Sequence, residues 1–129
     1  MTWDLSQLEE LLSKRADWAI HSEDGCLCIT NEDGLDAYLA ISGQQIVVES
    51  ILFDKGNVKN VADLNEEILK THQLFPLTTV AITNIEDQEY YMAFGALSSQ
   101  SKEESIVIEV ETLFNNVAGF LDAYEDYLK

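Results

Sequence analysis

Apolar residues between positions 101 and 129 recur at alternating steps of three and four, a spacing that aligns side chains along one face of an α-helix. This seam consists of Val107, Val110, Phe114, Val117, Leu121, Tyr124 and Leu128. A second stripe with a step of seven runs beside it, at Ile106, Leu113 and Phe120. We therefore predict one long helix over 101–129, with an apolar face wider than a single neighbouring layer covers. Ser101 and Glu104 have capping-box spacing at its start.

A shorter amphipathic helix is predicted near the beginning of the chain, over about 3–14. Asp4 and Gln7 have the spacing of a capping box, in which each side chain bonds the backbone amide of the other residue. The inner stripe of this helix consists of Leu5, Leu8, Leu11 and Leu12. The segment 15–24 that follows lacks a clear period, and we interpret it as irregular or as a short strand.

A third helix is predicted over about 62–73. Asp63 and Glu66 again have capping-box spacing, and Pro76 prevents the helix from continuing past Phe75. Its apolar stripe is modest and consists of Leu64, Ile68 and Leu69.

Between the helices, apolar and polar residues alternate with the period of β-strands. The predicted strands cover residues 26–30, 35–42, 46–53, 77–85 and 89–97. Gly34 and Gly43 lie in the first two connections, where hairpin turns need glycine. The order α-βββ-α-ββ-α predicts a single α+β domain over 1–129, with an antiparallel sheet of about five strands and three helices packed on it.

The chain is strongly acidic, and this narrows the kinds of partner that we expect. Its 129 residues carry 24 Asp and Glu against 7 Lys and Arg, giving a net charge of −17. Such a surface repels nucleic acid and anionic lipid, so we expect no nucleic-acid binding and no direct membrane insertion. A basic or amphipathic protein partner is favoured, although the acidity also suits simple solubility. The N-terminus has no secretory pattern, so we expect a cytoplasmic protein.

Candidate chemistry in the sequence is sparse. Cys26 and Cys28 share one face of a predicted strand, where buried free thiols are the favoured interpretation over a metal or redox site. The two histidines, His21 and His72, are isolated in the sequence, and a nucleophilic pair of His21 with Cys26 is a remote alternative. Since no phosphate-binding loop, dinucleotide fingerprint or nucleophile elbow is present, we predict no enzyme, no cofactor and no metal.

We therefore predict a non-catalytic protein-binding module, chaperone-like or adaptor-like, that also forms a homodimer. The residues expected to contact a partner are Leu64, Ile68, Phe114, Leu121, Tyr124 and Leu128. The alternative is a small ligand-binding regulatory domain with a pocket between sheet and helix.

The order of elements, the small size and the acidity together resemble the class I type III secretion chaperones and the related YbjN-like proteins. This resemblance implies a secretion-chaperone-like fold and dimers that bind an extended partner segment along apolar grooves. It implies no catalysis.

Two segments carry a second resemblance: Trp3-Asp4-Leu5 at the start of the chain, and residues 109–116, with the sequence Glu-Val-Glu-Thr-Leu-Phe-Asn-Asn, in the last helix. In these the chain resembles the YjfI family of bacterial proteins. That resemblance implies a link to a membrane-remodelling protein of the phage-shock-protein-A type, a helical and amphipathic partner.

Overall fold

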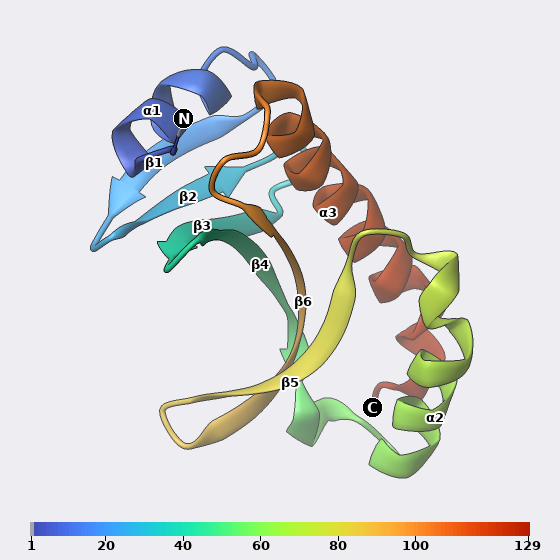
Figure 1. Ribbon diagram of the computed structural model, residues 1–129. Helices are drawn as coiled ribbons and strands as arrows, with labels where there is room; N and C mark the ends of the chain where they lie inside the picture. The colour runs from blue at the N-terminus through green and yellow to red at the C-terminus, as the bar shows by residue number, and fades with distance from the viewer. Residues whose placement is uncertain (1) are drawn as a thin grey trace.

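A single antiparallel sheet forms the body of the protein, and the helices pack against one of its faces (Figure 1). The structure is a computed structural model that describes residues 2–129. Its helices are α1 (Leu5–Leu12), α2 (Val61–Thr71) and α3 (Glu103–Ala123). Its strands are β1 (Ala19–Glu23), β2 (Cys26–Thr30), β3 (Asp36–Ser42), β4 (Gln45–Asp54), β5 (Thr79–Ile85) and β6 (Gln88–Ser98). The α+β class is thus confirmed, with one strand more than predicted.

The additional strand is β1, in the segment that the sequence left as irregular or as a short strand. It pairs with β2 along its whole length, from Ala19 opposite Thr30 to Glu23 opposite Cys26. Four of its five residues are exposed, so the apolar alternation that reveals a half-buried strand is missing. The sheet order is β1-β2-β3-β4-β6-β5, which makes β1 and β5 the edge strands.

The long helix α3 lies across β4 and β6, while α1 covers β1 and β2. Tryptophans join these two parts of the helical layer. Trp18 packs on Phe114 of α3, with ring centroids 6.1 Å apart. The indole N–H of Trp3 donates a hydrogen bond of 2.7 Å to the carbonyl oxygen of Ser101, directly before α3. Among the helices in residues 2–129, none has the length and apolarity needed to cross a membrane.

The helix starts agree with the sequence prediction at α1 only. There the Asp4–Gln7 capping box is confirmed. In α2 the predicted Asp63–Glu66 box is wrong, because the helix begins earlier and Asn60 caps it by accepting from the amide of Asp63. At α3 the N-cap is Lys102, without a side-chain cap bond.

The last helix is also shorter than the predicted 101–129, because α3 ends at Ala123. A 3-10 turn, Glu125–Tyr127, follows it. Leu128 then forms an isolated antiparallel bridge with Val58. The backbone amide of Lys59 donates a hydrogen bond of 2.9 Å to the carbonyl oxygen of Tyr127. The chain end thus closes over the segment that leads into α2.

The opposite, concave face of the sheet is open: within residues 2–129, no helix lies on it (Figure 1). Alternation along the strands places half-buried side chains there. Examples are Tyr38, Val47, Met92 and Phe94. The two faces therefore differ, with a closed core under the helices and a partly apolar open surface on the other side.

Glu109 is an acidic residue that is buried between α3 and the sheet, and its exposed fraction is 6%. Its Oε2 is buried without a hydrogen-bond partner among the described residues. The carboxyl lies against Gly95 of β6, where a Cβ would collide with Oε2. Burial raises the pKa of Glu109 above its ordinary value, because the charged form loses water without gaining a partner.

This predicts that Glu109 destabilises the fold at neutral pH. Because its folded-state pKa is raised, the cost is absent below the unfolded pKa of about 4.3 and grows as pH rises through the folded value. Glu109→Gln should therefore raise the free energy of unfolding by about 1 kcal/mol at neutral pH. The gain should shrink as the pH falls toward about 5. Urea unfolding across this range tests it, with the exposed Asp122→Asn on the same helix as control. A pH-independent difference would contradict the prediction.

Candidate functional site

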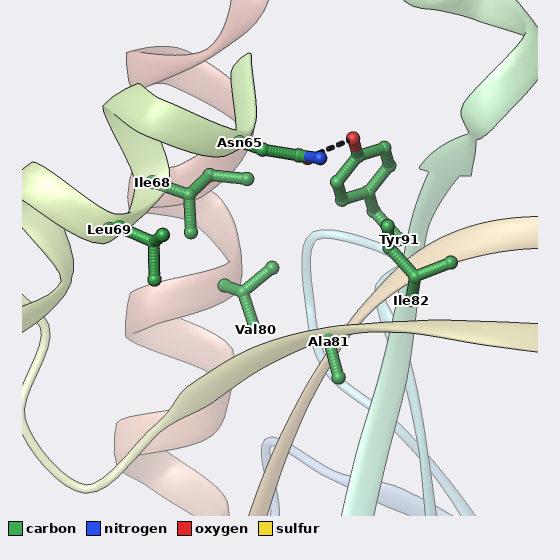
Figure 2. Close-up of a pocket in the computed structure, with 7 residues that line it drawn as sticks. All are labelled: Asn65, Ile68, Leu69, Val80, Ala81, Ile82 and Tyr91. Carbon is green, nitrogen blue, oxygen red and sulfur yellow. Dashed lines mark hydrogen bonds between the residues drawn. The ribbon is translucent and has the colours of Figure 1, made fainter. Parts of the chain in front are cut away.

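An apolar groove runs between α2 and the edge strand β5 (Figure 2). It has a volume of about 300 Å³. The lining residues are Asn65, Ile68, Leu69, Val80, Ala81, Ile82 and Tyr91. The groove exists because α3 covers β4 and β6, whereas β5 lies beyond it at the edge of the sheet and is only flanked by α2.

Two aliphatic side chains of the groove are exposed to solvent, although large apolar side chains are usually buried. Leu69 on α2 is 78% exposed and Ile82 on β5 is 39% exposed. The base of the groove is fixed, because the hydroxyl of the buried Tyr91 donates a hydrogen bond to Oδ1 of Asn65 (Figure 2). The site thus combines a rigid floor with apolar walls that are open to another molecule.

The outer edge of β5 presents backbone groups beside this groove. The backbone amide of Val80 donates a hydrogen bond of 3.1 Å to Nε2 of His72. This amide therefore points away from β6. Because alternate residues of an antiparallel strand bond to the same neighbour, Ile82 and Asn84 also direct their backbone groups away from β6. His72 therefore occupies the first outward position of the edge, and the following positions can pair with an added strand.

The edge also lacks the usual protection against pairing. Natural edge strands commonly carry charged residues or proline that prevent another chain from adding to the sheet. Apart from His72, the stretch 71–85 contains neither acidic nor basic residues, although the chain as a whole has a net charge of −17. The whole of β5 lies in this stretch. The edge of β5 is therefore uncharged in an otherwise strongly acidic protein.

The residues predicted to contact a partner lie mostly inside the protein. Leu64, Ile68, Phe114 and Tyr124 are at most 5% exposed. Tyr124 is also held by a hydrogen bond of 2.9 Å between its hydroxyl and that of Thr71. Leu121 and Leu128 are partly buried against the core. Of the six, Ile68 alone lines the groove.

The expected apolar surplus of α3 is largely covered within the chain itself. The prediction assumed a five-stranded sheet and a helix that continues to the chain end. In the structure Phe75 packs on Phe120, with ring centroids 4.3 Å apart, and Trp18 covers Phe114. Ile108, 52% exposed, is the main large apolar side chain of α3 that stays open in the described residues. On α2, Leu69 belongs to the predicted apolar stripe with Leu64 and Ile68, but it is exposed in the structure.

The cysteines are free, as predicted, but the surroundings of His21 differ from the prediction. His21 is not isolated, because it lies directly opposite Cys28 in the β1–β2 ladder. The remote pairing of His21 with Cys26 is therefore wrong, since Glu23 faces Cys26. Both cysteines are free. Burial, together with the charge of Asp36, raises the pKa of the Cys28 thiol, so this sulfur is a poor nucleophile at neutral pH.

The α+β fold of the protein is similar to that of YbjN and to chains of two solved complexes. The crystal structure of YbjN from E. coli matches with a TM-score of 0.75 at 15% identity, over 97% of this chain and 96% of that one. The structure of the HopA1–SchA chaperone–effector complex contains a chain that matches at 0.64 and 11% identity, over 91% of both chains. A chain of the ExsC–ExsE complex matches at 0.65 and 12% identity, over 93% and 94%.

The sequence identifies the family directly. Residues 2–128 match the model of a family described as uncharacterised and conserved in bacteria, DUF2170, and the chain belongs to this family. It is 28% identical over 131 aligned residues to the protein YjfI of Escherichia coli K12, with 98% of each chain covered. The predicted similarity to YjfI is thus confirmed.

Two leucines on α2, one in the core and one in the groove, are expected to differ in how much they contribute to stability. Leu64 is fully buried and Leu69 is 78% exposed. We expect Leu64→Ala to lower the free energy of unfolding by about 2–5 kcal/mol, because it opens a cavity. Leu69→Ala should change it by less than about 0.5 kcal/mol. Urea unfolding of both variants measures the difference, and equal losses would show that Leu69 is buried in solution.

Proposed function

We propose that this protein is a non-catalytic binding module, chaperone-like or adaptor-like, that holds an extended segment of a protein partner at β5. The observation that carries the proposal is the uncharged edge of β5 beside the α2–β5 groove. A partner strand added to this edge gains backbone hydrogen bonds, and its alternate side chains reach Leu69 and Ile82. The protein performs this task in the cytoplasm.

The structural neighbours support this proposal. Two of them come from complexes of protein chains, and one is described as a chaperone with its effector. At 11–12% identity these neighbours share the fold alone. What they add is an example of a helix–sheet body of this shape in a complex with another protein.

The occupant of the groove is a partner segment that combines apolar and basic side chains. The apolar part matches the groove walls, and the basic part matches the surrounding charge of −17. A membrane-remodelling protein of the phage-shock-protein-A type is the candidate partner. The resemblance to the YjfI family implies this link, and an extended segment of such a partner would occupy the edge of β5.

The module forms a homodimer in this proposal, through the turn that follows α2. Leu74 is 70% exposed and Leu77 is 60% exposed, both within the uncharged stretch 71–85. Two copies that each carry −17 repel one another over most of their surface, so they approach most easily through an uncharged patch.

The second candidate function is a small regulatory domain that binds a ligand in the same groove between sheet and helix. A volume of about 300 Å³ lies at the lower end of the range of about 300–1,000 Å³ for such sites. The groove is favoured as a protein site because polar groups converge only at Asn65 and Tyr91.

The main proposal is tested by calorimetry, which measures the binding of this protein to a purified protein of the phage-shock-protein-A type. We expect a complex that Leu69→Glu combined with Ile82→Glu weakens at least about 30-fold, because both substitutions place charge in the apolar groove. Ile108→Glu is the matched control, since Ile108 is an exposed aliphatic residue on α3 outside the groove.

Equal binding by the groove variant and the control would contradict the groove assignment. A failure of the wild-type protein to bind would contradict the proposed partner. Stabilisation by a small metabolite that competes with the complex would favour the regulatory domain.

Light scattering at micromolar concentration tests the dimer separately. We expect the mass of two chains for the wild type and of one chain for Leu74→Glu combined with Leu77→Glu, because the charges repel across the contact. The same variant should keep its binding to the partner. A wild-type monomer would contradict the dimer and leave the groove proposal standing.

A further inference from the structure

A group of three potential metal ligands lies on the open face of the β1–β2 hairpin, away from the α2–β5 groove. Nε2 or Nδ1 of His21, a carboxylate oxygen of Glu23 and Sγ of Cys28 lie within 4.8 Å of one another. In the ladder His21 faces Cys28 directly. His21 and Glu23 are two positions apart on β1, so they project from the same face.

The backbone register fixes this arrangement. Five consecutive pairs hold β1 against β2, from Ala19 opposite Thr30 to Glu23 opposite Cys26. A shift by one residue would turn His21 and Glu23 to the other face. Leu27 and Ile29 oppose such a shift in β2, because they are at most 1% exposed in the core. The hairpin is therefore a rigid support for the three side chains.

The side chains are already turned toward a common point. Nε2 of His21 lies 2.8 Å from Oε1 of Glu23, in an exposed contact. Cys28 lies beneath them and is 3% exposed. Donor atoms around tetrahedral zinc are about 3.3–3.8 Å apart, given bond lengths of about 2.0–2.3 Å. Small rotations of the exposed His21 and Glu23 side chains cover the difference.

We propose that His21, Glu23 and Cys28 bind a divalent transition-metal ion of the zinc type. Imidazole and thiolate ligands select such ions over calcium and magnesium, which prefer oxygen ligands alone. Three protein ligands leave a fourth position for water or another molecule.

A hollow lies on the same face of the sheet, and Tyr38, which is opposite Cys28 in the ladder, belongs to its lining. This hollow has a volume of about 450 Å³ and is lined by Cys26, Tyr38, Ala40, Ser42, Val47 and Glu49. A molecule bound there could reach the metal from the concave side of the sheet. The metal site is thus independent of the edge of β5, and its test is independent of the proposed partner.

The site is tested by titrating the reduced protein with cobalt(II) while its absorption spectrum is recorded. We expect one ion per chain, ligand-field bands in the visible range and a sulfur-to-cobalt charge-transfer band, because Co²⁺ adopts zinc-like coordination with a thiolate ligand. Zinc should displace the cobalt. Cys28→Ser should remove the charge-transfer band, whereas Cys26→Ser should keep it.

His21→Ala serves as a second variant, because His21 is exposed on the edge strand β1 and its loss removes no core contact. We expect it to weaken the affinity for zinc at least about tenfold, measured by calorimetry. Asp33→Asn, in the neighbouring exposed turn, is the control and should bind as the wild type does. Absence of the charge-transfer band, or its persistence in Cys28→Ser, would overturn the proposal. Equal zinc affinity in His21→Ala and the wild type would also overturn it.

Discussion

The burial of α3 against β4 and β6 is the interaction on which the rest of the structure depends. Its core positions include Ile106, Val110, Leu113, Val117 and Phe120, each at most 1% exposed. Contacts from distant parts of the chain hold both ends of the helix in place. Trp3 bonds to Ser101 before the helix, and Leu128 pairs with Val58 after it. Because burial of this area is the main favourable term in folding, α3 fixes the covered face of the sheet, and the shorter helices fill the remaining positions on that face.

The same arrangement explains why the edge of the sheet is left open. A single helix covers the central strands, so β5 lies beyond its reach and is flanked by α2 alone. Leu64 and Ile68 anchor α2 to the core, while Leu69 points away from it and is 78% exposed. The groove is thus a geometric consequence of covering a six-stranded sheet with one long helix and two short ones.

Much of the fold could be predicted from the sequence, because it depends on strong periodic signals. The three helices, five of the strands and the turns at Gly34 and Gly43 were all visible in this way. The strand β1 could be predicted only as one of two alternatives for the segment 15–24, because its exposed residues do not alternate. The end of α3 at Ala123 was missed because the apolar period continues through Leu128, which packs instead from a separate bridge.

The candidate site was harder to predict, since helical spacing identifies an apolar face but not what covers it. Phe114 and Tyr124 belong to that face and are covered by Trp18 and by Phe120. The useful signal was the absence of Asp, Glu, Lys and Arg between 71 and 85, which is visible in the sequence but acquires meaning only when β5 is known to be an edge. The closeness of His21 and Cys28 likewise requires the pairing of β1 with β2.

Residue-resolved hydrogen exchange of β5 tests the central claim most directly, namely that this edge is open in the free protein. The account predicts fast exchange at the amides of Ile82 and Asn84, which point away from β6, and slow exchange at Ala81 and Thr83, which pair with it. Addition of the partner should slow the first two amides. Uniform protection along β5 in the free protein would contradict the account, because it would show that the edge is already covered.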